Sequence, residues 1–150
     1  MREPLFDGFR GGLERTFFHG HSYSGNQLGC AAALANLDLF EEEQTLSKVA
    51  RGAAILKEAS QAFWELPQTG DVRQEGMVLA VELVRDRATR EPFPSQDRLA
   101  HRINERARAK GLLARGLGAT LFLIPPYCST EEELRRMVAA LLASAREVLN

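Results

Sequence analysis

The chain is poor in cysteine, and the two cysteines that it has give no sign of a metal site. Cys30 and Cys128 lie in unrelated contexts, without a Cys-x-x-Cys pair or a cluster of cysteine and histidine. We therefore expect reduced, mostly buried thiols in a cytoplasmic protein, and we expect no bound metal.

The chain also lacks a long apolar run and an excess of charge of one sign. Its apolar runs are far too short to span a bilayer, and no apolar signal core follows the first residues, so we expect neither a membrane span nor export. With 19 Lys and Arg against 20 Asp and Glu, the formal net charge is −1. Such a balance gives no strong attraction to nucleic acid or to anionic membranes, so we expect neither as a partner.

What remains is the composition of an ordinary globular protein with a core of its own. The chain has 150 residues, of which 45% are hydrophobic and 26% charged. Hydrophobic periodicity predicts helices over residues 27–43, 46–66, 95–110 and 130–149, and strands over 71–74, 77–84, 112–115 and 120–124. This order predicts an α+β fold, in which a small antiparallel sheet is covered by helices.

The most informative stretch runs from His19 to Asn26 and reads HGHSYSGN. It lies directly before an alanine-rich run that is predicted to be helical. A loop of this kind suits a phosphate, because glycine allows a close backbone approach and Ser22 or Ser24 can donate a hydrogen bond. The alternative is a helix start that is capped by its own side chains and binds no ligand.

Arg115 is the second candidate for a binding residue. It ends a predicted short strand in an apolar neighbourhood and is followed by the sequence GLG. A guanidinium in this place can hold a carboxylate through two parallel hydrogen bonds. The alternative is a solvated or ion-paired surface arginine. Arg73, before the sequence QEG, is interpreted as structural.

No residue of the chain is predicted to be catalytic. His19 and His21 are of the residue type that most often serves as a general acid or base, but histidines beside glycine in a loop more often bond to the backbone. Only three lysines are present, at positions 48, 57 and 110, and all lie in predicted amphipathic helices, in contexts typical of solvated faces.

Three blocks of the sequence together resemble the class III, pyridoxal-phosphate-dependent aminotransferases. They are HGHSYSGN with the following QLGCAAALANL, then DVRQEGMVLAVELV, then ARGLGATLFLIPPY, and the likeness runs from about residue 17 to the C-terminus. The resemblance implies that residues 1–44 are the end of a large domain, with its phosphate-clamp loop and last helix. It implies that residues 45–150 are the C-terminal small domain of a fold type I enzyme.

The same resemblance implies specific roles for four residues. Ser22 and the backbone of His21 would bind the phosphate of the cofactor, with Ser22 reaching across a dimer interface. Gly20 would line the substrate site, and Arg115 would hold the carboxylate of the substrate. Many members have proline in place of His21 and of Gln27, which leaves the conformation of the loop open.

The family's Schiff-base lysine precedes the HGHSYSGN loop, so this chain resembles the C-terminal part of a longer enzyme and is expected to be inactive alone. The resemblance implies amino transfer from S-adenosylmethionine to 8-amino-7-oxononanoate, giving 7,8-diaminononanoate in biotin biosynthesis, by a homodimer. One alternative is another class III aminotransferase, acting on an ω-amino acid or a diamine or using lysine as donor. The other is a non-catalytic α+β interaction module, and a neighbouring reading frame that encodes the lysine-bearing part would discriminate between them.

Overall fold

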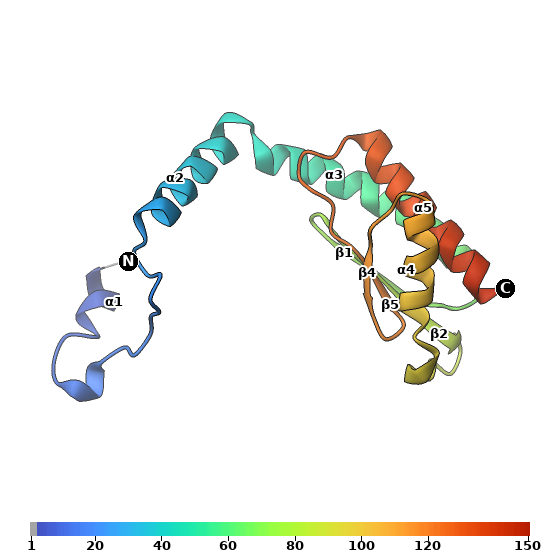
Figure 1. Cartoon of the computed structure of the whole chain (residues 1–150), viewed down its shortest axis with the longest axis horizontal. Helices are drawn as coiled ribbons and strands as arrows, with labels where there is room; N and C mark the ends of the chain where they lie inside the picture. Colours follow the sequence, from blue (N-terminus) through green and yellow to red (C-terminus); the bar gives the residue numbers. More distant parts are fainter. Residues whose placement is uncertain (1–2) are drawn as a thin grey trace. The chain divides into compact units, whose positions relative to one another are not determined.

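The structure, a computed structural model, describes residues 3–150 and divides the chain into two compact units. The first unit ends at Leu39, and the second comprises Phe40–Asn150. Figure 1 gives the labels of the helices and strands in both units.

The first unit consists of helical segments and loops that bury none of their own side chains. It holds α1 (Glu3–Asp7), the short 3₁₀ helix η1 (Leu13–Arg15) and most of α2 (Gln27–Glu42). The predicted helix over residues 27–43 is therefore confirmed. Every described residue up to Leu39 is exposed, including Cys30. Cys128 is exposed as well, so the prediction of mostly buried thiols is wrong.

The second unit is a small antiparallel sheet with helices, which confirms the predicted α+β fold class. Its strands are ordered β1-β2-β5-β4, and a short β3 pairs with β2. Its helical elements are α3 (Thr45–Ser60), η2 (Gln61–Glu65), η3 (Ser95–Asp97), α4 (Leu99–Ala109) and α5 (Glu131–Leu149). Its strands are β1 (Thr69–Glu75), β2 (Val78–Asp86), β3 (Glu91–Pro92), β4 (Arg115–Leu117) and β5 (Thr120–Leu123).

Alternation along the two central strands divides the sheet into a covered face and an open face. Leu79 pairs with Leu123, and Val81 pairs with Leu121. These four side chains are at most 3% exposed, because neighbours in register point to the same face of a sheet. They meet buried side chains of α3, α4 and α5 in one core: Leu56, Ile103, Ala107, Leu134, Val138 and Leu141. These helices lie together beside the sheet in Figure 1.

Strand β4 begins three residues later than the sequence predicts. The apolar run of residues 112–114 favoured a strand over 112–115, but these residues form the connection that leaves α4. Pairing with β5 is set by a two-residue turn at Gly118, whose φ is +61°, so Leu117 lies opposite Thr120 and Arg115 opposite Phe122. Arg115 therefore starts the strand rather than ending it.

Among the helices of residues 3–150, none combines the length and the apolarity that crossing a membrane requires.

Thr130 followed three residues later by Glu133 is the sequence signature of a capping box, and helix α5 begins with one. The Thr130 hydroxyl oxygen accepts the backbone N–H of Glu133 at 3.3 Å, and the Glu133 carboxylate accepts the backbone N–H of Thr130 at 2.8 Å. These two bonds satisfy donors that a helix start otherwise leaves unpaired. The N–H and hydroxyl of Thr130 hold the pKa of the Glu133 carboxyl below its ordinary value.

Thr130→Ala is expected to lower the free energy of unfolding by about 1 kcal/mol, because it removes the side-chain acceptor of the cap. Equilibrium unfolding in urea, followed by circular dichroism, measures this change. Ser129→Ala is the matched control, since the Ser129 side chain makes no hydrogen bond within residues 3–150. Equal losses in the two variants would contradict the assignment.

Candidate functional site

The HGHSYSGN loop of the first unit is closed by hydrogen bonds within a four-residue turn. The Ser24 hydroxyl oxygen accepts the backbone N–H of His21 at 3.1 Å, and the backbone N–H of Ser24 donates to the His21 carbonyl at 2.9 Å. Nδ1 of His21 accepts the backbone N–H of Tyr23 at 3.1 Å. The His21 ring therefore orders the backbone of the loop.

Asn26 caps the helix that follows the loop. Its side-chain oxygen accepts the backbone N–H of Gly29 at 2.9 Å, and its carbonyl accepts the N–H of Cys30 at 2.9 Å. The preceding residue, Gly25, has a φ of +72°, which favours glycine. The capped helix start, one of the two interpretations of this motif, is thus present, and it leaves the earlier residues of the loop available.

Ser22 is the serine of the loop whose hydroxyl is free to meet a ligand. The Ser24 hydroxyl is engaged with the backbone of His21, whereas the exposed Ser22 hydroxyl has no hydrogen-bond partner among the described residues. The two serines are chemically alike, and the family resemblance selects Ser22; in the turn, the Ser24 hydroxyl is engaged and the Ser22 hydroxyl is not. Gly20 and His21 are exposed beside Ser22 in the same loop.

Arg115 belongs to the second unit, on the open face of the sheet. In register, Arg73 of β1 pairs with Ala80 of β2, Ala80 with Phe122 of β5, and Phe122 with Arg115 of β4. These four residues form one row across the sheet and share one face. Because Leu121 and Leu123, on either side of Phe122, point into the core, this row points away from the helices.

The two arginines of this row have different surroundings. Nη1 of Arg73 lies 2.8 Å from a carboxylate oxygen of Glu82 and 2.8 Å from one of Asp71, and these bonds raise the pKa of Arg73. This pairing fits the structural role predicted for Arg73. Arg115 is exposed and makes no ion pair with any described residue. Arg115 is thus the guanidinium of the row that a carboxylate ligand can reach.

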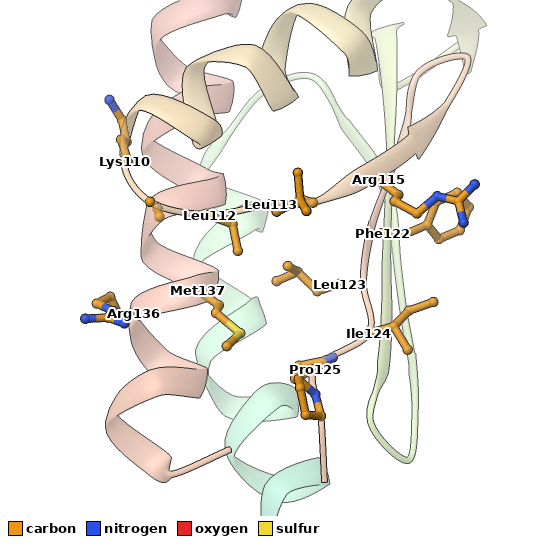
Figure 2. A pocket seen from close by; sticks show the side chains of 14 residues that line it. Lys110, Leu112, Leu113, Arg115, Phe122, Leu123, Ile124, Pro125, Arg136 and Met137 are labelled. Carbon is orange, nitrogen blue, oxygen red and sulfur yellow. The ribbon is translucent and has the colours of Figure 1, made fainter. Parts of the chain in front are cut away.

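A cavity of about 360 Å³ lies beside Arg115, between the segment 110–115, the end of β5 and α5. Figure 2 shows Leu112, Leu123 and Met137 directed toward its interior, whereas Arg115 extends away from it on the side of Phe122. The cavity is therefore apolar, and Arg115 lies at its edge. This cavity could not be predicted from the sequence, because its walls come from three segments that are separate in the chain.

The chain's lysines lie in surface contexts. Nζ of Lys48 is 2.7 Å from a carboxylate oxygen of Glu43, and Nζ of Lys110 is 2.6 Å from one of Glu147. Lys57 is exposed on α3. Within residues 3–150, no three His, Cys, Asp or Glu side chains are grouped so that they could hold a metal ion.

Comparison with known proteins defines the class of protein to which the chain belongs. The family described as Aminotransferase class-III matches residues 7–144, and the chain belongs to this family. The family depends on pyridoxal phosphate.

Several members of this family are similar to the chain in sequence or in structure. The chain is 46% identical over 139 residues to the adenosylmethionine-8-amino-7-oxononanoate aminotransferase of Anoxybacillus flavithermus, covering 91% of this chain and 31% of that protein. The crystal structure of the enzyme of the same name from Methanocaldococcus jannaschii superposes with a TM-score of 0.87 at 34% identity, over 95% of this chain and 33% of that one. A PLP-bound amine transaminase from an uncultivated Pseudomonas species gives 0.87 at 33% identity, over 97% and 33%. The chain thus spans about a third of the length of the relatives it matches.

The chain alone is expected to form no specific covalent adduct with pyridoxal phosphate, because its lysines occupy surface contexts. Incubation with the cofactor, reduction with borohydride and peptide mass spectrometry test this expectation. Scattered substoichiometric labelling of all three lysines would agree with it. Stoichiometric labelling of one lysine would contradict it.

Proposed function

We propose that the chain forms part of an aminotransferase that transfers an amino group from S-adenosylmethionine to 8-amino-7-oxononanoate. The product would be 7,8-diaminononanoate, a precursor in biotin biosynthesis. The observation that supports the proposal is the combination of two features of this chain. It is 46% identical to an adenosylmethionine-8-amino-7-oxononanoate aminotransferase, and it presents the unpaired guanidinium of Arg115 on the open face of its sheet. In this proposal residues 1–44 belong to the large domain and residues 45–150 form the small domain.

The loop residues fit the phosphate end of the cofactor. The Ser22 hydroxyl has no partner within the described chain, and the bonds of Ser24 and His21 hold the turn that presents it. When bound, pyridoxal phosphate supplies the electron sink for amino transfer. Ser22 would donate a hydrogen bond to the phosphate in the partner subunit of a homodimer, with the backbone of His21 beside it and Gly20 lining the substrate site. The reactive lysine would come from outside the present sequence.

Arg115 would bind the acceptor at the end remote from the reacting carbon. The acceptor is a carboxylate with an aliphatic chain, and two parallel hydrogen bonds from a guanidinium fix the direction in which that chain leaves. Phe122 and Ile124 lie on the same open face as Arg115 and offer apolar surface for the methylene groups. The clamp therefore orients the acceptor, while bond making takes place elsewhere.

Two other functions compete with this proposal. The likeness to an amine transaminase, with the same TM-score as the enzyme from M. jannaschii, shows that the fold does not select the substrate. A class III aminotransferase for an ω-amino acid or a diamine is therefore the first competitor. A non-catalytic interaction module is the second, and a neighbouring reading frame that encodes the lysine-bearing part would argue against it.

Ser22→Ala is expected to weaken cofactor retention by about tenfold or more in the full-length enzyme, since a hydrogen bond to a charged group contributes roughly 1.5–3 kcal/mol. Ser22→Thr keeps the hydroxyl donor and should be tolerated. Equilibrium dialysis of pyridoxal phosphate measures both. Ser24→Ala is the control for loop geometry, because the Ser24 hydroxyl bonds to His21. If Ser22→Ala and the parent retain the cofactor equally, Ser22 has no role as a phosphate clamp.

Arg115→Ala is expected to raise the KM for 8-amino-7-oxononanoate strongly in the full-length enzyme, while the half-reaction with the amino donor changes much less. Arg115→Lys keeps the charge but loses the planar fork, so it should not restore acceptor binding. Single-turnover kinetics of the two half-reactions make the comparison. Equal losses in both would assign Arg115 to the fold or to the cofactor rather than to the acceptor.

A further inference from the structure

We infer that Ala100 of α4 is a positioning residue that sets the place of Arg115 through the backbone of β4. The inference rests on the proposed role of Arg115 as the carboxylate clamp. Strand β4 has three residues and lies at the edge of the sheet, where its strand neighbour is β5 alone. The distance between β4 and the core therefore depends on which residues of the helices pack against this strand.

Helix α4 touches β4 where a glycine removes the intervening side chain. A Cβ placed on Gly116 would lie 2.5 Å from the Cβ of Ala100 and 2.8 Å from the carbonyl oxygen of Thr120. The backbone of β4 thus rests directly against the methyl group of Ala100. The backbone N–H of Ala100 also donates to the carbonyl of Gly118, in the turn after β4, at 3.1 Å.

These two contacts are made on the covered face of β4, whereas the side chain of Arg115 lies on the open face. Ala100 is 2% exposed and borders the covered face, whereas the neighbour of Gly116 in the chain, Arg115, belongs to the open face. A ligand held by Arg115 therefore never meets Ala100. A larger side chain at position 100 has no free volume toward Gly116, so it must displace β4 and carry the backbone of Arg115 with it.

The matched control is Ala107, which lies two helical turns further along α4 and is 0% exposed. Both alanines face the core, so Ala100→Val and Ala107→Val add the same volume to the same helix. We expect Ala100→Val to raise the KM for 8-amino-7-oxononanoate about tenfold in the full-length enzyme, because a misplacement of about 1 Å can cost up to a hundredfold. The kcat and the donor half-reaction should change little, and Ala107→Val should leave this KM unchanged while lowering the melting temperature.

A purely structural role for Ala100 would make the two valine variants behave alike, and that result would overturn the inference. If a valine variant fails to fold, the milder pair Ala100→Ser and Ala107→Ser supports the same comparison. Arg115→Lys is measured in parallel. If Arg115→Lys leaves the acceptor KM unchanged, the proposed function fails. If Arg115→Lys raises that KM while Ala100→Val matches Ala107→Val, the inference about Ala100 alone fails.

Discussion

The pairing of β2 with β5 is the constraint on which the second unit depends. These strands lie about 40 residues apart in the chain, and their register places Leu79 opposite Leu123 and Val81 opposite Leu121. A shift of β5 by one residue would turn Leu121 and Leu123 to the open face and expose the core to water. The burial of this quartet therefore fixes which residues of both strands, and of their outer neighbours, remain accessible.

Arg115 is accessible as a consequence of that register. Strand β4 has no buried side chain of its own, so its face is determined by pairing with β5 and by the turn at Gly118. Phe122 points away from the core because its two neighbours point into it, and Arg115 follows Phe122. The core thus positions a charged residue that it never touches, at the edge of a sheet whose other face carries the core.

The sequence predicts what depends on local chemistry and fails where distant contacts decide. The capping box at Thr130 and the helix start after Asn26 need only neighbouring residues, and both are present. The start of β4 was misplaced because apolar residues 112–114 have strand-like character, while pairing is set by a turn beyond them. Ser22 and Ser24 are chemically alike; the family resemblance selects Ser22, but the sequence does not show that the Ser24 hydroxyl is engaged with the backbone of His21. The exposure of Cys30 was missed, since a small apolar residue on an alanine-rich helix favours burial.

In the proposed function, Ser22 and Arg115 would contribute by binding rather than by making or breaking bonds. The charge of the phosphate and that of the remote carboxylate do not change during amino transfer. Groups that hold them therefore stabilise the bound substrate and the transition state to the same extent. Such uniform binding lowers KM and leaves kcat to the residues at the reacting atoms. A displacement of Arg115 by α4 would therefore appear first in the KM of the acceptor. The reacting amine would belong to another part of the enzyme, and this division of roles agrees with a chain that has no predicted catalytic residue.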